Sequence, residues 1–591
     1  MDESIKVPQP EPIKGGMPEP TEINYFLSDP HIHFLLAHYA NDNYRLFKAK
    51  LMELGDRASN EIDQLSREAD RHPPTLTMYD KRGQRINDVN YHSSYSRLEE
   101  IGYEEFGLVA MSHRIGVMGS KEVFNKVMKY TFWYVFAQAE FGLCCPMSMT
   151  DSAAKILEDY GSLELKEEYL SKLISTKSNR MTAAQFMTEK QGGSDVGANS
   201  VTAEANGDAW FITGDKWFCS NVSADVALVL ARPIDAKEGT KGLAMFLVPR
   251  IIPGGERNHY TINKLKDKLG TKGMASGEVT FERAIGYLVG ELDHGFKQMM
   301  SMVNASRLSN SVRSTGLIRR SYLEALYTTR GRIAFEKPLA KLPLMQKQLF
   351  EMMLTSEVAT SMSLYTAYMY DLTESKKDEK AKTMLRLLTP LLKGVICKQA
   401  RVIAGESMEM RGGNGYIEEW ANAKLVRDAH LGSIWEGTTN IVALDVLRAI
   451  TKNKANTVLI ETMKTILNEV TFVDFTPLKK KLLTNIHRLE EDLNLIGQVS
   501  PTDVEMEAIS IMQHIYYLVA NCLLLQEAEI ERKKTRSYRK YFNACYYYHL
   551  HFRESKSRCF HESVWQWGED VINWVMIPRS AISLFNEYLS K

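Results

Sequence analysis

The sequence is poor in cysteine and has no excess of either charge. Its 7 cysteines are scattered over 591 residues, which indicates reduced thiols and no disulfide framework. The adjacent pair Cys144 and Cys145 suits neither a zinc site nor a CxxC redox motif, and we expect no metal. Lys and Arg together number 73, as do Asp and Glu, and this balance gives no electrostatic argument for binding nucleic acid or membranes.

The sequence predicts neither a membrane segment nor a targeting segment. We find no run of about 18 apolar residues, so the sequence predicts no transmembrane helix. The N-terminal stretch MDESIKVPQPEPIKGGMPEP lacks the apolar centre of a signal peptide and the arginine-rich character of a transit peptide, and the final YLSK is not the peroxisomal SKL. We expect a cytoplasmic protein; a mitochondrial location stays open if the N-terminus was trimmed.

The chain has no internal repeat and no GxGxxG turn between a strand and a helix, which argues against a solenoid and a Rossmann domain. Apolar residues at helical spacing instead flank a block of short β-rich runs bounded by Gly and Pro. One run, DAWFITGDKWFCSN, alternates around a predicted turn at Gly214 and Asp215. We therefore expect a mostly α fold with an inserted β domain. Its predicted parts are an extended N-terminal arm (1–30), an N-terminal helical domain (31–180), a middle β domain (181–290), a helical bundle (291–452) and a C-terminal helical extension (453–591).

Two stretches near the start of the β block are suited to holding a planar ligand. Residues 187–200, MTEKQGGSDVGANS, form a glycine-rich loop with hydroxyl groups, and such a loop lets backbone N–H groups approach a ligand. Residues 215–221, DKWFCSN, combine two aromatic rings with a serine that could bond to the edge of a stacked ring. Each has a plainer interpretation when taken alone: a polar turn for the first stretch, and aromatic packing in a β core for the second.

A third stretch carries an isolated acid. Residues 410–441 begin with glycines that are expected to end a long helix, and they continue to the sequence IWEGTTNI. Glu436 lies there between a Trp and a Gly. By itself it is typical of a solvated turn, although the apolar Ile434 and Trp435 before it are also consistent with burial.

In this order and at these separations, the three stretches resemble the acyl-CoA dehydrogenase superfamily. The form MTEKQGGSDV and the C-terminal extension are most similar to its AidB-like branch. The resemblance covers about residues 90 to 450. It implies the fold of that family, with an N-terminal helical domain, a middle β-barrel and a helical bundle, here followed by the C-terminal helical extension. It also implies an FAD-dependent oxidoreductase that introduces a double bond between Cα and Cβ of a fatty acyl-CoA.

The resemblance assigns roles to particular residues. Glu436 matches the carboxylate that abstracts the α-proton of the thioester, while the hydride passes to FAD. The expected FAD contacts are Met187, Thr188, Ser194, Trp217, Phe218 and Ser220 within one subunit, and Arg332, Phe335 and Gly413 from a neighbouring subunit. The expected substrate contacts are Met147, Met149, Thr150, Ser194 and Arg307. Methionines on a helix are more often core residues, and the arginine could instead form a helix-packing salt bridge.

The resemblance further implies a homotetramer with FAD bound across subunits, a fatty acyl-CoA or fatty acid as ligand, and electron-transfer flavoprotein or another electron acceptor. We favour a medium to long acyl chain. The sequence departs from the family pattern at Glu409, where other members have Gln, and at Lys190 and Gln191, which replace a common Pro-Gly pair. Residues 336–349 do not align with a motif that supplies another Gln. Part of the cross-subunit FAD contact therefore stays open.

Two other functions are considered. AidB-like proteins have been linked to DNA through their C-terminal domain, and residues 531–542, ERKKTRSYRKYF, contain six positive side chains with tyrosines nearby. We favour a solvated helix face for this segment and consider DNA an unlikely partner. A protein with the same fold could also act as a sensor that sequesters a fatty acid or acyl-CoA, but the intact Glu436 and FAD loop favour retained chemistry.

Overall fold

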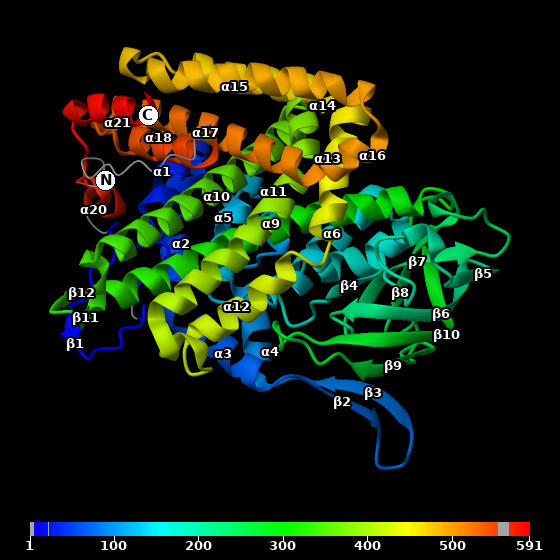
Figure 1. The fold of residues 1–591 in the computed structure, drawn as a ribbon. Coiled ribbons are helices and arrows are strands. Elements are labelled where there is room, and N and C mark those ends of the chain that lie inside the picture. The colour runs from blue at the N-terminus through cyan, green and yellow to red at the C-terminus, as the bar shows by residue number, and fades with distance from the viewer. Residues whose placement is uncertain (1–4, 22, 553–565, 591) are drawn as a thin grey trace. The chain divides into compact units, whose positions relative to one another are not determined.

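The computed structural model describes residues 5–21, 23–552 and 566–590, and it is mostly helical with an inserted block of strands, which confirms the predicted fold class (Figure 1). The chain forms two compact units. The barrel unit consists of Arg57–Arg313 and Ile434–Gly437. The helical unit joins the N-terminal segment up to Asp56 to Ser314–Ser433 and to the C-terminal part from Thr438. Each unit is described separately.

The barrel unit is built around a closed sheet. Strand β7 pairs with β5, β5 with β6, β6 with β10, β10 with β8, and β8 again with β7, so that five strands form a ring. Strands β4 and β9 extend the sheet by pairing with β7 and β10. The barrel strands are β4 (Ala183–Phe186), β5 (Thr202–Asn206), β6 (Ala209–Ser220), β7 (Val226–Pro233), β8 (Ala244–Pro249), β9 (Tyr260–Leu265) and β10 (Ser276–Leu288).

The barrel interior is filled by apolar side chains from alternate positions of these strands. Ile212, Val229, Phe246, Val248 and Phe281 are all buried in one core cluster. Burying each such side chain contributes roughly 1.5–3 kcal/mol relative to exposure. This core fixes the barrel on which the loops of the predicted site are mounted.

The strand that carries the DKWFCSN sequence corrects one prediction. Gly214 and Asp215 do not form a turn, because β6 runs without a break from Ala209 to Ser220. The turn lies earlier, at residues 206–209, where β5 pairs with β6. Gly214 has φ 130°, and a Cβ there would lie 3.0 Å from Val201. The glycine therefore reflects the close approach of another backbone segment, which alternating polarity does not reveal.

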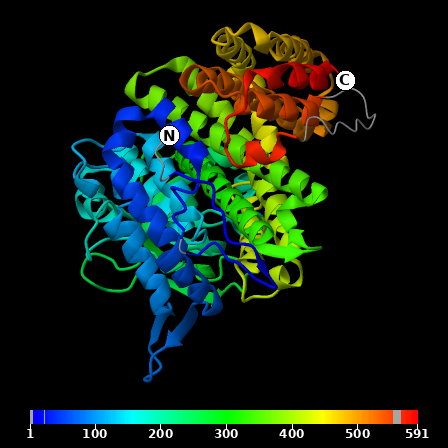
Figure 2. The ribbon, with the colours of Figure 1, turned by 90° about the vertical axis from the view of Figure 1, so that its left-hand side faces the viewer.

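Helices accompany the barrel in its unit. They are α3 (Asp63–Arg71), α4 (Ser93–Glu99), α5 (Lys126–Ala137), α6 (Cys144–Tyr160) and the first part of α9 (Gly295–Gly331). The side chain of Asn125 caps α5 by accepting a hydrogen bond from Met128 N at 2.8 Å. A hairpin of β2 (Thr75–Tyr79) and β3 (Arg85–Asn90) lies in a region predicted to be helical, and it extends beyond α3 and α4 (Figure 2).

The helical unit contains long helices joined by short connections. Its main elements are α1 (Pro30–Tyr39), α2 (Asn41–Arg57), the rest of α9, α10 (Pro343–Ser375), α11 (Glu379–Arg411), α12 (Ala421–Gly432), α13 (Thr439–Asn453), α14 (Ala455–Asn468), α15 (Thr476–Leu495), α16 (Pro501–Met506), α17 (Ala508–Thr535), α18 (Arg539–Phe552), α20 (Gly568–Ile572) and α21 (Ile582–Ser590). Strands β1 (Ile13–Lys14), β11 (Arg332–Ala334) and β12 (Lys337–Pro338) form a small sheet. As expected from the glycines, α11 ends at Gly412, whose φ of 72° lies in the left-handed region.

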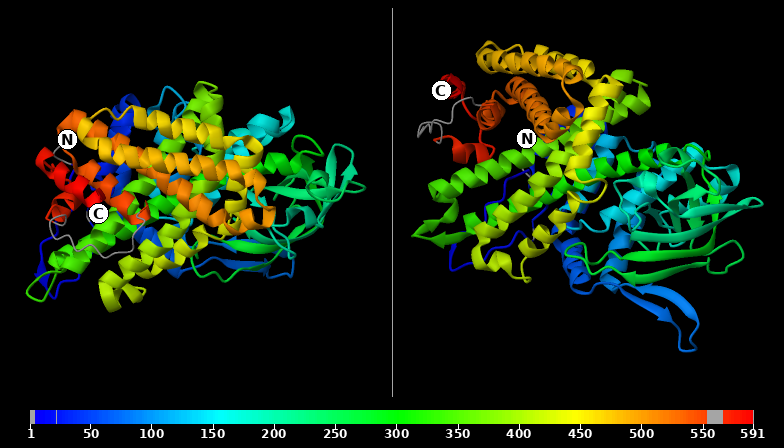
Figure 3. Two further views of the ribbon diagram at one scale, coloured as in Figure 1. Left: turned by 45° about the horizontal axis from the view of Figure 1, so that its top comes forward. Right: turned by 45° about the vertical axis from the view of Figure 1, so that its right-hand side comes forward.

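The C-terminal helices pack on one another and on the long helices before them. Helix α17 contacts α13, α14, α15 and α18, and the layer that they form is visible in Figure 3. By length and composition, α17 is apolar enough to cross a membrane. However, 67% of its most apolar window is buried inside the protein, as in the core helix of a globular protein. The long apolar helix missed in the sequence is thus a packing helix of this unit.

Candidate functional site

The isolated acid of the IWEGTTNI stretch lies on a left-handed turn. Glu436 has φ 57° and the following Gly437 has φ 97°, so the backbone bends sharply at both residues. A positive φ is uncommon for a residue with a side chain, and such strain is often associated with functional sites. The glycine satisfies the second left-handed position without steric cost.

Two residues of α9 hold this turn. Ser306 Oγ donates a hydrogen bond to Glu436 Oε1 at 2.9 Å, and Arg307 Nε donates to the backbone carbonyl of Glu436, also at 2.9 Å. Both α9 residues are buried. Arg307 also donates to Asn304 Oδ1 at 3.3 Å. The predicted arginine is therefore placed against the backbone of the acidic turn, and the adjacent Ser306, which sequence reasoning missed, fixes one carboxylate oxygen.

The two apolar neighbours of the acid behave differently. Ile434 is 60% exposed, so the prediction that it helps to bury Glu436 is wrong. Trp435 is half-buried, and its ring stacks on Phe141 with 6.1 Å between ring centroids. Glu436 itself is half-buried. One side of the turn is therefore packed by aromatic rings.

The two stretches predicted to hold a planar ligand lie together. The backbone N–H of Trp217 donates to the carbonyl of Thr188 at 2.9 Å. Phe218 is 53% exposed, while Trp217, Thr188 and Ser220 are half-buried. Aromatic faces and hydroxyl donors are thus accessible on neighbouring segments of one barrel. This donor set fits the isoalloxazine of FAD, which needs both stacking surface and hydrogen bonds at its edge.

Other predicted flavin contacts are arranged around the same stretches. The carbonyl of Met187 accepts hydrogen bonds from Asn199 Nδ2 at 2.9 Å and Lys216 Nζ at 3.3 Å. Ser194 lies exposed in the glycine-rich loop. Lys266 Nζ lies 3.5 Å from the centroid of the Trp217 ring, which is cation–π geometry.

A buried ion pair that was not predicted holds the glycine-rich loop. Lys216 Nζ lies 2.7 Å from Glu189 Oε1, and neither side chain is exposed. The other oxygen of Glu189 accepts from the backbone N–H of Ser200 at 2.7 Å and from its hydroxyl at 2.9 Å. Burial alone would raise the pKa of the Glu189 carboxyl, but Lys216 and Ser200 outweigh this and lower it. The pair therefore ties the start and end of residues 189–200 to β6.

The residues predicted to reach FAD from a neighbouring subunit belong to the helical unit. Arg332 is half-buried on β11, and Phe335, just after it, is 81% exposed with φ 50°. Gly413 is exposed, and a Cβ there would meet nothing within 4 Å. Gly413 is therefore accessible to another chain. No atom of its own chain lies close enough to exclude a larger side chain at this position.

The predicted substrate residues on α6 are engaged in packing. A Cβ added to Gly102 would lie 2.8 Å from Met147 Sδ, so this methionine packs closely on that backbone. Thr150 Oγ1 donates to the carbonyl of Pro146 at 2.8 Å and accepts from Ala183 N at 3.0 Å. Met149 is also buried. These contacts join α6 to its neighbours, including the first barrel strand.

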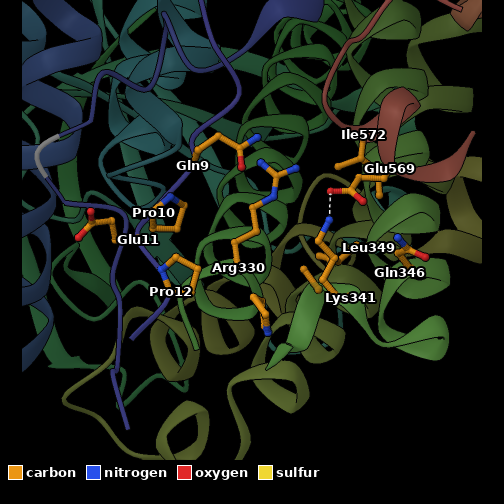
Figure 4. Close-up of a pocket in the computed structure, with 12 residues that line it drawn as sticks. Gln9, Pro10, Glu11, Pro12, Arg330, Lys341, Gln346, Leu349, Glu569 and Ile572 are labelled. Atoms are coloured by element: carbon orange, nitrogen blue, oxygen red, sulfur yellow. Dashed lines mark hydrogen bonds and ion pairs between the residues drawn. The ribbon is translucent and has the colours of Figure 1, made fainter. Parts of the chain in front are cut away.

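A pocket of about 380 Å³ lies in the helical unit, between the N-terminal arm and the segment around β12 (Figure 4). Its charged groups include Arg330 and Lys341, and Lys341 forms an ion pair with Glu569. Arg330 is also bonded, to the carbonyl of Pro8 at 2.6 Å. Neither Glu436 nor any predicted flavin contact lines this pocket, so it is not the predicted active site.

The basic segment at residues 531–542 is only partly the solvated face that we favoured, since Lys533, Lys534 and Arg536 are exposed while its second half is buried. Arg539 and Lys540 are fully buried and form ion pairs with Glu357 at 2.5 Å and 3.0 Å. Arg532 and Lys533 pair with Glu529. Much of the positive charge is thus neutralised within the fold, which leaves little of it to meet phosphates.

Comparisons with known proteins agree with the geometry. Three family models match: "Adaptive response protein AidB N-terminal domain" over residues 17–179, "Acyl-CoA dehydrogenase, middle domain" over 184–284, and "Acyl-CoA dehydrogenase, C-terminal domain" over 293–451. Acyl-CoA dehydrogenase family member 11 of Caenorhabditis elegans is 34% identical over 448 residues, which cover 73% of this chain and 72% of that protein. Putative acyl-CoA dehydrogenase AidB of Escherichia coli K12 is 35% identical over 419 residues, with 68% and 73% covered. The crystal structure of C. elegans ACDH-11 in complex with C11-CoA superposes with a TM-score of 0.84 at 28% identity and covers 95% of each chain.

Proposed function

The chain belongs to the acyl-CoA dehydrogenase family, in its AidB-like branch, and from this premise we propose that it catalyses the FAD-dependent α,β-dehydrogenation of an acyl-CoA with a medium to long acyl chain. The observation that carries the proposal is the Glu436 carboxylate, presented on a left-handed turn and held by two residues of α9. The sensor remains the alternative, in which the same site binds without turnover.

In the proposed reaction, Glu436 takes the proton from Cα of the thioester. A positioned general base contributes typically about 10²–10⁴ in rate, provided that its geometry is fixed. Ser306 supplies that constraint at the carboxylate, and Arg307 supplies it at the backbone carbonyl. The family resemblance assigns the Glu436 N–H to the thioester oxygen, where a fixed donor stabilises developing negative charge.

The cofactor site proposed here uses residues of two subunits. Thr188, Trp217 and Ser220 would hold the isoalloxazine within one chain, and Arg332 and Phe335 would be contributed by a second copy in a homotetramer. When bound, FAD supplies the hydride acceptor for Cβ. Electrons would then pass to electron-transfer flavoprotein or another acceptor. The exposed Phe335 supports the cross-subunit part of this proposal, since it leaves the ring available to another chain.

The acyl-CoA ligand is supported by a structural relative. ACDH-11 of C. elegans has been crystallised with C11-CoA, and this chain matches it over 95% of its length. That relative binds an acyl-CoA of medium length, which supports a ligand of the same class here. Binding alone does not distinguish an enzyme from a sensor.

Anaerobic titration of the purified flavoprotein with acyl-CoAs of graded length tests the proposal. Bleaching of the flavin absorbance is expected for the wild-type protein, and the length that bleaches fastest identifies the substrate range. Glu436→Gln should keep its flavin but bleach about 10²–10⁴ times more slowly. Glu282→Gln, an exposed barrel residue, is the matched control. Tight binding without bleaching in the wild-type protein would favour the sensor and contradict the enzyme.

A further inference from the structure

A buried arginine near the proposed base lacks the partner that such a group requires. Arg313 lies on α9 and is fully buried. Among the described residues, none of its three guanidinium nitrogens has an oxygen or nitrogen atom as hydrogen-bond partner, so no carboxylate bonds to it. Arginine stays protonated in proteins and carries five N–H donors. A buried charge of this kind is costly unless a counter-ion neutralises it.

Two other fully buried arginines show the usual solution. Arg539 bonds to Glu357 with two of its nitrogens, and Arg320 bonds to Glu324 at 2.8 Å and 3.0 Å. Each is as buried as Arg313 and is neutralised by a carboxylate of the fold. Arg313 differs from them because no carboxylate in the described part of the chain bonds to it.

The surroundings of Arg313 place it at the site of the proposed chemistry. Its guanidinium carbon lies 4.5 Å from the ring centroid of Trp435, which directly precedes the proposed base, and 5.6 Å from that of Phe141. Burial raises the pKa of the nearby Cys145 thiol; the charge of Arg313 and a weak hydrogen bond from it oppose this, and the charge of Glu436 adds to it. The charges of Arg313 and Glu436 therefore both act on the Cys145 thiol, which lies near both groups. A neutral thiol is not a counter-ion for the guanidinium. The aromatic faces support the cation, but they satisfy none of its N–H donors in the plane of the guanidinium.

The spacing along α9 gives the distance between Arg313 and the proposed base, Glu436, which acts on the Cα–H bond of the thioester. Ser306, which holds the carboxylate of Glu436, precedes Arg313 by seven residues, or two helical turns. The two positions therefore lie on the same face of the helix, separated by about 10 Å along its axis. An acyl chain of several carbons spans about this distance, so a thioester with its Cα at Glu436 would bring the far end of its chain to the guanidinium.

We infer that Arg313 is a specificity-determining residue that binds an anionic group at the far end of the acyl chain, so that the preferred ligand is an ω-carboxyacyl-CoA. A carboxylate there would accept hydrogen bonds from the guanidinium fork in the bidentate geometry that arginine favours. This inference rests on the proposed function and deepens it, because it names the chemical group at the end of the chain opposite the thioester.

Calorimetric titration of the flavin-loaded protein tests the inference without requiring turnover. Adipoyl-CoA and suberoyl-CoA are each compared with the chain of equal length that ends in a methyl group, hexanoyl-CoA and octanoyl-CoA. We expect at least one dicarboxylic thioester to bind about a hundredfold more tightly than its partner. Arg313→Met should abolish or reverse this preference. Equal affinities in the wild-type protein, or tighter binding of both methyl-ended chains, would overturn the inference.

Stability separates a ligand-binding arginine from a structural one. Arg313→Met removes an unneutralised buried charge, so its melting temperature without ligand should equal or exceed that of the wild-type protein. Arg283→Met, which removes an exposed arginine of β10, is the control. A clearly lower melting temperature for Arg313→Met would indicate a structural role and overturn the inference. If that variant does not fold, the wild-type binding comparison decides alone.

The same samples separate this inference from the proposed function. If dicarboxylic thioesters bind more tightly but no thioester bleaches the flavin, the inference holds and the enzyme proposal fails. If methyl-ended chains bleach the flavin and the dicarboxylic ones bind no better, the enzyme proposal holds and the inference fails.

Discussion

Ser306 is the side chain in direct contact with the carboxylate of the proposed base. Its hydroxyl donates to Glu436 Oε1 at 2.9 Å, and hydrogen bonds to charged groups contribute about 1.5–3 kcal/mol. Ser306→Ala should therefore lower kcat by roughly ten- to a hundredfold with little change in KM, because the base loses its fixed orientation. Ser309→Ala is the control, since Ser309 is buried on the same helix and its hydroxyl has no hydrogen-bond partner among the described residues. Equal kcat in the two variants would remove Ser306 from the site.

At the residue scale, the sequence is informative where a motif has a fixed local geometry. The EGT motif, which follows the glycine-rich turn at the spacing typical of the family, predicts Glu436 as the base, and the backbone bends at this residue in the structure. Ser306 and Arg313 carry no comparable signal. Each is one polar residue in the helix GFKQMMSMVNASRLSNSVRSTG, and only the fold reveals which of its many polar side chains faces the acid.

The glycine-rich loop is the element most dependent on one buried interaction. Glu189→Gln would leave the Lys216 ammonium buried without its counter-ion, and breaking a buried pair typically costs about 3–5 kcal/mol. We expect a lower melting temperature and partial loss of flavin during gel filtration, because the Ser200 contacts that hold the loop weaken too. Glu204→Gln, which alters an exposed ion pair on β5, serves as the control. Full flavin retention with an unchanged melting temperature would contradict this role.

Helices α5 and α6 share an ion cluster that makes stability depend on pH. His113 bonds to Asp151 and Glu158 of α6, and Lys129 of α5 pairs with Asp151. Burial alone would lower the pKa of His113, but the two carboxylates raise it above its ordinary value of 6.5. The stability gained from the protonated ring is fully present below about pH 6.5 and is lost as the pH rises through the higher folded-state pKa.

Replacing His113 by Gln should therefore cost more at pH 6 than at pH 9. We expect a difference of about 1–3 kcal/mol in unfolding free energy at the lower pH, measured by denaturant titration at both values. His259→Gln, on the same unit, controls for a general effect of removing a histidine. A constant difference between the two pH values would show that the His113 charge does not stabilise the cluster.

At the element scale, sequence patterns predicted the order of helical and β regions better than their details. The β-rich runs bounded by Gly and Pro do form the barrel strands. The predicted turn at Gly214 is wrong, because the local sequence around a glycine does not distinguish a strand from a turn. The hairpin β2–β3 was missed because its strands are short and largely exposed. Burial of Arg539 and Lys540, in the second half of the basic segment, could not be recognised, since their neutralising partner Glu357 lies far away in the sequence.

For the molecule as a whole, the C-terminal extension is part of the helical unit and not an appended domain. Glu357 of α10 accepts hydrogen bonds from Arg539, Lys540 and Asn543 of α18, all of them buried. Burial alone would raise the pKa of this carboxyl, but Arg539 and Lys540 together hold it well below its usual range. Its contribution to stability is thus present above the ordinary glutamate pKa and is lost as the pH falls through the lower folded-state value.

Glu357→Gln should consequently destabilise α10 and the extension together. Arg539 would lose its carboxylate partner and Lys540 would keep only Glu527, at a cost of about 3–5 kcal/mol. Because α17 and α20 also pack on α10, we expect the unit to unfold in one transition, with no protease-resistant fragment that begins near residue 455. Differential scanning calorimetry and limited proteolysis measure these two outcomes. Glu351→Gln is the matched control, since it ends an exposed ion pair with Lys347 of the same helix and leaves an oxygen that can accept from Tyr546 of α18. Release of a stable C-terminal fragment, with the rest of the unit melting as before, would show instead that the extension is an independent domain.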